Sequence, residues 1–285
     1  MRNRTRLLSL FLCLLLAATA AAQRTLVVNR PVANMYSGPT EDTDVVSQAL
    51  FGAPVTVVED KGDWLKIRTA DDYMGWAQKT ALIDKPYAAS GAVATVRALV
   101  ANLYREKSVT KHAPMLAVPF DSRLEIADPG KEGDRWLQVR LPDGRTAFVQ
   151  NGDVTLQTVK LDIPGSISHA KRFLGVNYLW AGTSTFGFDC SGFTQMLMKQ
   201  RGILMPRDAD VQAAWNGLVA VDKKDLQPGD LLYFGSSPQK ITHTGYYIGD
   251  GKFIHATTHE HPEVQISDIN EAYWTKLLVA CRRAK

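Results

Sequence analysis

A cysteine and two histidines are the side chains of this sequence best suited to nucleophilic catalysis. Cys190 stands in the stretch GFDCSGF, and the apolar residues after it recur with helical spacing. A helix N-terminus and a nearby histidine favour the thiolate form of a cysteine, whose ordinary pKa is about 8.5. His243 and His255 follow in HTGYYIGDGKFIHA. A lone cysteine at a helix start is more often structural than catalytic, so the histidines decide between the two interpretations.

The two histidines are expected on neighbouring strands of a hairpin. A three-residue turn at 249–251 puts His243 opposite Thr257. His255 is two residues along that strand, and side chains two apart share a face. The imidazoles are therefore predicted to be adjacent, whereas a two-residue turn would place them on opposite faces. One imidazole would act on Cys190 while the second orients it.

An α+β unit is predicted to position these three residues. A helix is expected through HAKRFLG, capped by Ser166 or Ser168, and another starts at Cys190 with Asp189 as its cap. A strand in LQPGDLLYFG and the hairpin follow, and helices before antiparallel strands are typical of the α+β class. Cys281, in VACRRAK, is expected to be buried in a final strand.

The N-terminal half contains an internal repeat. VANMY at 32–36 returns as VANLY at 100–104, and GDWLKIR at 62–68 returns as DRWLQVR at 134–140. Gly, Asp and Pro turns separate short β-branched runs in each unit. This spacing predicts two small all-β units rather than helical repeats.

The first residues have the composition of a secretory signal peptide. Three arginines precede an apolar run at 7–16, and small residues ending at Ala22 predict cleavage before Gln23. The run is short for a bilayer span, and an uncleaved anchor is the alternative. The mature chain would carry 30 basic and 29 acidic residues, a balance that gives no indication of nucleic acid or anionic lipid as a partner. The expected location is the periplasm or the medium.

No cofactor and no metal are expected. His259 and His261, in THEHPEV, lack the cysteine or HExxH spacing of a zinc site, and neither GxGxxG nor GxxxxGK[ST] occurs. We expect a monomer without a nucleic-acid partner and, after cleavage of the signal, without a membrane contact.

The order DCSGF, HTGYYIGDG, FIHA resembles the NlpC-type family of papain-like cell-wall cysteine peptidases, over about the last 115 residues. The β-units resemble the bacterial Src-homology-3-like barrels that accompany cell-wall enzymes, through their Trp-hydrophobic-x-hydrophobic and Gly-Trp-hydrophobic strands. The resemblance implies two small all-β barrels before an α+β papain-like domain. The expected boundaries are 1–22 for the signal peptide, 23–84 and 85–157 for the barrels, and 158–285 for the peptidase.

The resemblance also implies catalytic roles. Cys190 would be the nucleophile, His243 the general base and His255 the residue that orients it. Tyr178, in VNYLWAG, matches the family's aromatic position before the cysteine, whose hydroxyl helps define the catalytic pocket. Ordinary core packing is the alternative for Tyr178.

The phrase PRDAD and the two β-units narrow the resemblance to the γ-D-glutamyl-L-diamino-acid endopeptidases (dipeptidyl-peptidase VI). These enzymes release L-Ala-γ-D-Glu from cell-wall peptides. In that subgroup the segment matching Arg207–Ala209 binds the free amine of L-Ala, and Asp208 would pair with it, because a desolvated unpaired charge is costly. A solvated loop or a helix cap is the alternative for Asp208. The implied substrate-binding residues are Tyr178, Asp189, Ser191, Arg207, Asp208, Ala209 and, on the first barrel, Asp44 and Tyr73.

The predicted function is therefore a cysteine endopeptidase that hydrolyses the γ-D-glutamyl–diamino acid bond of peptidoglycan peptides with a free N-terminal L-Ala. An N-acetylmuramoyl-L-alanine amidase and an endopeptidase for intact stems are alternatives on the same scaffold. A wall-binding module without catalysis is the alternative from another class. Diaminopimelate and lysine both remain open as the diamino acid.

Overall fold

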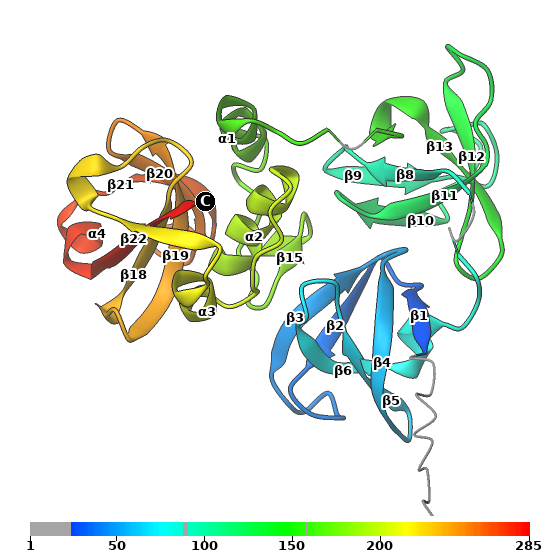
Figure 1. The fold of residues 1–285 in the computed structure, drawn as a ribbon. Coiled ribbons are helices and arrows are strands. Elements are labelled where there is room, and N and C mark those ends of the chain that lie inside the picture. Colours follow the sequence, from blue (N-terminus) through cyan, green and yellow to red (C-terminus); the bar gives the residue numbers. More distant parts are fainter. Residues whose placement is uncertain (1–23, 88–90, 158) are drawn as a thin grey trace, which may run out of the picture.

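The computed structural model describes residues 24–87, 91–157 and 159–285 (Figure 1). Two β-domains come first in the chain and an α+β domain follows, so the predicted fold class is confirmed. The signal peptide predicted at residues 1–22 lies outside the described residues, and the domain boundaries stay predictions. Among the described residues, no helix combines the length and the apolar character needed to cross a membrane.

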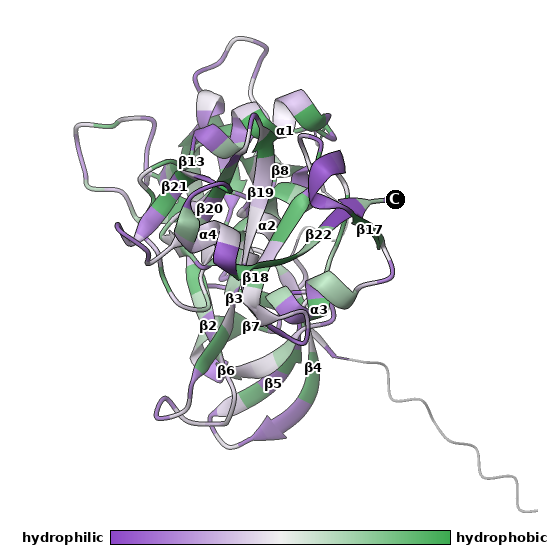
Figure 2. Cartoon of the chain, turned by 90° about the vertical axis from the view of Figure 1, so that its left-hand side faces the viewer, coloured by the Kyte–Doolittle hydropathy of each residue, from purple (hydrophilic) through white to green (hydrophobic). Residues whose placement is uncertain are grey.

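The first β-domain is one antiparallel sheet of seven strands. Buried and partly exposed residues alternate along its strand β5, and hydrophobic and hydrophilic bands succeed one another along the strands in Figure 2. Side chains such as Met35 and Ile67 fill the core on one face. The strands in sheet order are β3 (Val45–Leu50), β2 (Val32–Tyr36), β6 (Met74–Gln78), β5 (Trp64–Arg68), β4 (Pro54–Lys61), β1 (Thr25–Val28) and β7 (Leu82–Ile83).

The second β-domain repeats features of the first. An edge-to-face pair of Tyr36 and Trp64, with ring centroids 5.3 Å apart, recurs as Tyr104 and Trp136 at 5.6 Å. The repeated sequence is therefore a repeated structure. A five-stranded sheet contains β13 (Thr146–Gln150), β12 (Trp136–Arg140), β11 (Arg123–Asp128), β8 (Val93–Val96) and β14 (Val154–Thr155), and a two-stranded sheet contains β10 (Leu116–Pro119) and β9 (Val100–Leu103).

The α+β domain packs helix α2 (Cys190–Gln200) against a six-stranded antiparallel sheet. Phe193 and Leu197 of α2 share a core with Tyr246 of the sheet, and Cys281 is buried in the last strand, as predicted. The sheet order is β17 (Leu218–Val221), β22 (Leu278–Ala284), β18 (Leu231–Ser237), β19 (Lys240–Gly249), β20 (Lys252–Thr257) and β21 (Glu263–Asp268). The other elements include α1 (Ile163–Lys171), β15 (Thr183–Ser184), β16 (Gly187–Phe188), α3 (Ala209–Ala214) and α4 (Ala272–Leu277).

The hairpin of the two histidines has the predicted register but a different turn. Tyr246 lies opposite Ile254, as the three-residue turn required. The turn itself contains two residues, Asp250 and Gly251, both with positive φ. A β-bulge just before Gly249 accommodates one extra residue and restores the register. The predicted turn was wrong, and the histidines still share a face because of the bulge.

Helix α1 begins earlier than predicted. Asp162 is its N-cap and accepts a hydrogen bond from the Gly165 amide at 2.7 Å. Pro164 fits the first turn, where a backbone N–H has no partner within the helix. Ser166 and Ser168 lie inside the helix, so the predicted caps were wrong.

Each β-domain inserts one aromatic side chain into the core of the next domain. Phe51, just after β3, belongs to the core of the second β-domain. Phe120, just after β10, packs edge to face with Phe173 in the core of the α+β domain, 5.4 Å between centroids. Full burial of such a side chain stabilises the packed state by roughly 1.5–3 kcal/mol. These two contacts join each β-domain to the domain that follows it in the chain.

We predict that His169, beside Phe120, makes the fold less stable in acid. Its Nε2 is buried without a hydrogen-bond partner in the described chain, and burial lowers its pKa from 6.5 to about 4. Between these two values the unfolded chain binds a proton that the folded chain does not. The free energy of unfolding should therefore fall as the pH drops from 6.5 towards 4, and His169→Gln should reduce that fall.

Urea denaturation at pH 7.5, 5.5 and 4.5 measures this effect. His261→Gln replaces an exposed histidine and should keep the wild-type dependence on pH. Equal dependence in all three proteins would contradict the role of His169.

Candidate active site

Cys190 is the first residue of α2, and Asp189 is the N-cap. The Asp189 carboxylate accepts a hydrogen bond from the Gly192 amide at 2.7 Å, so the predicted cap is confirmed. A side chain at Gly192 would place its Cβ 2.2 Å from the carbonyl oxygen of Gly182, which explains the glycine in DCSGF. The same close packing leaves Cys190 only 8% exposed.

The two histidines meet in the arrangement that the hairpin register predicted. Nε2 of His243 lies 2.7 Å from Nδ1 of His255. His255 is fully buried, and its Nε2 lies 3.1 Å from the hydroxyl of Ser267. The backbone amide of Thr244, the residue after His243, donates a hydrogen bond to the sulfur of Cys190. The strand of the first histidine therefore runs directly beside the nucleophile candidate.

Burial keeps the thiol and both imidazoles neutral in the free protein. Desolvation, with the negative charge of Asp189 in addition, raises the pKa of Cys190 to about 12. Burial lowers the pKa of His243 to about 3 and that of His255 well below its usual value. We expected the helix start to lower the pKa of the thiol, and here desolvation has the larger effect. Attack by a neutral thiol would need its proton to move to a base, and His243, the residue before Thr244, is the candidate.

The thiol opens onto a cavity of about 770 Å³ between the α+β domain and the first β-domain. The first β-domain supplies Asp44 and Tyr73 to its wall, and Tyr178 lies on the side of the α+β domain. Burial and the nearby sulfur raise the pKa of Tyr178, so its phenol stays protonated. The lining residues are Asp44, Val45, Val46, Tyr73, Tyr178, Trp180, Ala181, Asp189, Cys190, Ser191, Asp208, Ala209, Asp210, Ile241 and Thr242.

Asp208 has the N-cap position of α3 but does not cap it through its side chain. Its carboxylate lines the cavity and accepts a hydrogen bond from the hydroxyl of Tyr73. Burial raises the pKa of this carboxyl, while Arg207 and the bond from Tyr73 partly offset the rise. Asp208 is thus the N-cap residue in position only, because its carboxylate meets a phenol of the first β-domain at the cavity wall and does not cap the helix.

Arg207 does not line the cavity, unlike the other predicted substrate-binding residues. It is 2% exposed and binds Asp189 with two hydrogen bonds, of 3.0 and 2.6 Å. It also donates to the hydroxyls of Ser191, at 2.7 Å, and of Ser47 in the first β-domain, at 3.3 Å. Arg207 therefore stabilises the start of α2 from the side away from the cavity.

The sequence alone did not reveal the surroundings of the histidine pair. Trp274 of α4 stacks on the His243 ring at 5.3 Å and meets His255 edge to face at 4.8 Å. Ser267 and Trp274 follow loops whose lengths predict no register, so spacing could not connect them to the histidines. Trp180, which lines the cavity and is 70% exposed, was also not predicted as a site residue. Its place two residues after Tyr178, a predicted site residue, could have indicated it.

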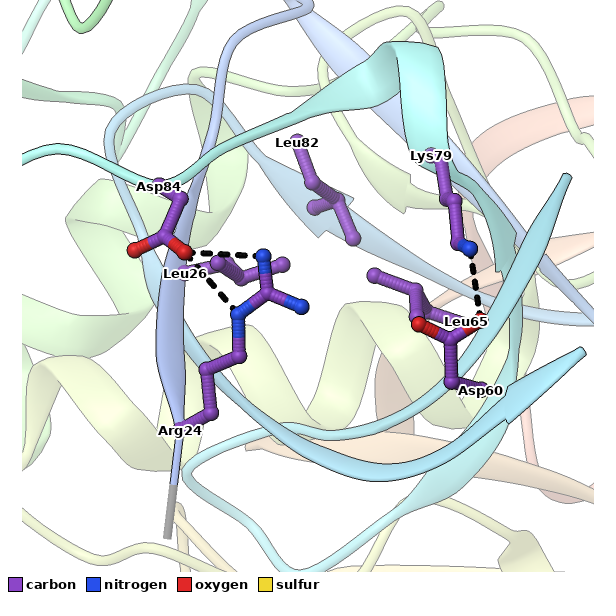
Figure 3. A pocket seen from close by; sticks show the side chains of 7 residues that line it. All are labelled: Arg24, Leu26, Asp60, Leu65, Lys79, Leu82 and Asp84. Carbon is purple, nitrogen blue, oxygen red and sulfur yellow. Dashed lines mark hydrogen bonds and ion pairs between the residues drawn. The ribbon is translucent and has the colours of Figure 1, made fainter. Parts of the chain in front are cut away.

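A smaller cavity of about 200 Å³ lies on the first β-domain (Figure 3). Arg24 pairs with Asp84 at 2.8 Å and Lys79 with Asp60 at 2.5 Å, on either side of Leu26, Leu65 and Leu82. These charges already have partners, and no nucleophile lines the cavity. Among the described residues, no three His, Cys, Asp or Glu side chains gather as potential metal ligands.

Known proteins resemble this chain in both its α+β domain and its first β-domain. The model of the NlpC/P60 family matches residues 175–283, and that of the bacterial dipeptidyl-peptidase Sh3 domain matches residues 35–82. A gamma-D-glutamyl-L-lysine dipeptidyl-peptidase from Bacillus cereus is 37% identical, over 86% of this chain and 76% of that protein. The protein of the same name from Bacillus subtilis is 31% identical, over 86% of this chain and 83% of that protein. The crystal structure of an NlpC/P60 family protein from Bacillus cereus aligns with a TM-score of 0.77 and 30% identity, over 91% of this chain and 99% of that one.

We predict that Arg207→Met destabilises the protein by about 3–5 kcal/mol, because it leaves the buried Asp189 carboxylate without its cation. Urea denaturation followed by circular dichroism measures the loss. Arg24→Met breaks the exposed pair with Asp84 and should cost about 1 kcal/mol or less. Similar small losses in both variants would show that the buried pair does not hold α2.

Proposed function

Because this chain belongs to the NlpC/P60 family of cysteine peptidases, we propose that it cleaves peptidoglycan peptides at the γ-D-glutamyl–diamino acid bond, next to a free N-terminal L-Ala. The product would be L-Ala-γ-D-Glu. The observation that carries the proposal is a single cavity that contains Cys190 and the half-buried carboxylate of Asp208. Both Bacillus relatives, named for γ-D-glutamyl-L-lysine, support the same bond.

In this proposal the carboxylate of Asp208 binds the free amine of L-Ala. An ammonium that leaves water needs an anionic partner, and Asp208 is an anion at the wall of this cavity. Burial raises the pKa of Tyr73 to about 12, so its phenol stays a neutral donor that orients the carboxylate. An intact stem carries an amide nitrogen at this position and would leave Asp208 unpaired. Asp208 would thus select free peptides, and the first β-domain would support it through the hydroxyl of Tyr73.

The reaction needs only a thiol, an imidazole and water. As the sulfur of Cys190 attacks the γ-glutamyl carbonyl, its proton moves to His243. His243 then gives this proton to the departing amine of the diamino acid, and a thioester remains on Cys190. Water, deprotonated by His243, attacks the thioester; L-Ala-γ-D-Glu is released, and His243 returns the proton to the departing sulfur of Cys190. The Cys190 amide at the start of α2 would stabilise the oxyanion.

The place of action follows from the first residues. The signal peptide predicted at 1–22 supports export, and peptidoglycan lies outside the cytoplasmic membrane. We therefore propose that the protein acts in the periplasm or in the medium.

We predict that Cys190→Ala abolishes hydrolysis of L-Ala-γ-D-Glu-L-Lys-D-Ala and of its diaminopimelate counterpart. Mass spectrometry of the products identifies the bond, with the alanine amine free in one set of peptides and acetylated in the other. Cys281→Ala removes the other described cysteine, which is buried in β22, and should remain active. Turnover by Cys190→Ala would refute the thiol mechanism, and release of L-Ala from muramic acid by the wild type would favour an amidase.

We predict that Asp208→Asn lowers kcat/KM for the free-amine peptide by at least about thirtyfold, the effect of about 2 kcal/mol from a lost charge pair. Its rate with the acetylated peptide should hardly change. Asp210→Asn removes the same charge from an exposed residue of the cavity and is the matched control. Equal cleavage of free and acetylated peptides by the wild type would remove Asp208 as the selector.

A further inference from the structure

The histidine pair continues into a third strand. His243, His255 and Ser267 lie on β19, β20 and β21, which are consecutive neighbours in the sheet (Figure 1). Their polar atoms are 2.7 Å apart at the first step and 3.1 Å at the second. Each step spans 12 residues of sequence. The three side chains thus form one hydrogen-bonded row across the sheet.

The register explains why Ser267 reaches His255. His255 lies opposite Gln265, so these two side chains share a face of the sheet. Ser267 is two residues beyond Gln265 and therefore lies on the same face, diagonal to His255. The step from His243 to His255 has the same diagonal form. The pairing of the strands, rather than a local motif, puts the hydroxyl in reach.

Only one set of tautomers lets His243 act as a base. A neutral imidazole carries one N–H, and the contact between the histidines holds one hydrogen. If Nε2 of His243 donates it, Nδ1 of His243 is free to accept the thiol proton. His255 then carries its own hydrogen on Nε2 and must donate it to Ser267. In the reverse arrangement His243 carries its hydrogen on Nδ1 and cannot take up a proton there.

The need for an acceptor is greatest when His243 is protonated. An imidazolium donates from both nitrogens, so Nδ1 of His255 has to accept and its Nε2 has to donate. His255 is fully buried, with Phe253 at 4.4 Å and Trp274 at 4.8 Å from its ring. The hydroxyl of Ser267 is the partner that the described structure gives to this nitrogen. A buried N–H without a partner would raise the energy of that state.

We infer that Ser267 is a positioning residue: its hydroxyl accepts the Nε2 hydrogen of His255 and so stabilises the tautomers in which Nδ1 of His243 carries no hydrogen. The inference deepens the proposed function, because it assumes that His243 takes the proton of Cys190. Ser267 acts through His255 and has no part in the cavity wall.

The test compares Ser267→Ala with Ser267→Thr, which keeps a hydroxyl. Ser122→Ala is the control, since this serine in the second β-domain is fully buried and its hydroxyl has no partner in the described chain. ¹⁵N spectra of histidine-labelled, substrate-free protein report which ring nitrogens carry hydrogen. Steady-state kinetics with the free-amine lysine peptide report kcat and KM separately.

We expect the wild type and Ser267→Thr to carry hydrogen on Nε2 of both histidines. In Ser267→Ala the hydrogen of each of these two histidines should move from Nε2 to Nδ1. The value of kcat should fall by about tenfold, the size expected when one buried donor loses its acceptor. KM should stay constant, and Ser122→Ala should match the wild type.

Unchanged tautomers and kcat in Ser267→Ala would overturn the inference, as would hydrogen on Nδ1 of His255 in the wild type. Failure of the wild type to cleave the peptide would instead count against the proposed function. The tautomers are read without substrate, so the two failures are distinguishable.

Discussion

The buried ion pair of Arg207 and Asp189 is the interaction on which the site depends. Asp189 caps the helix that presents Cys190, and Arg207 holds this cap while it also binds Ser191 and the first β-domain. A buried carboxylate without its cation would be costly, so the nucleophile, the cap and the β-domain are stabilised together. The first turn of α2, where Cys190 lies, is thereby joined through Arg207 to the first β-domain.

Exclusion of water from the same region sets its chemistry. Burial favours the neutral forms of the thiol and of both imidazoles, since a charge there has little solvent to stabilise it. A neutral thiol beside a neutral base is unreactive until a carbonyl lies next to the sulfur. Cys190 lines the cavity, while Trp274 packs on the ring of His243 and Phe253 on that of His255.

Much of the fold and the placement of Cys190, His243 and His255 were predictable, because short patterns determine both. The repeat of GDWLKIR as DRWLQVR and the short β-branched runs predicted two β-units, and the apolar spacing after Cys190 predicted a helix capped by Asp189. The side-chain alternation of a hairpin predicted adjacent histidines. The hairpin turn was predicted wrongly, because a β-bulge before Gly249 restores the register with a two-residue turn. The cap of α1 was predicted wrongly, because Asp162, earlier in the chain, caps the helix.

The sequence by itself thus determined the order of the domains, the start of the nucleophile's helix and the common face of His243 and His255. Each of these depends on residues close in the chain or on a strict period. Only the tertiary structure decided that Tyr73 meets Asp208, that Arg207 stays behind the cavity wall and that Ser267 completes the row of histidines. These contacts join segments whose separation is set by domain packing and by loops. No local spacing encodes them, because side chains distant in sequence meet only once the whole chain has packed.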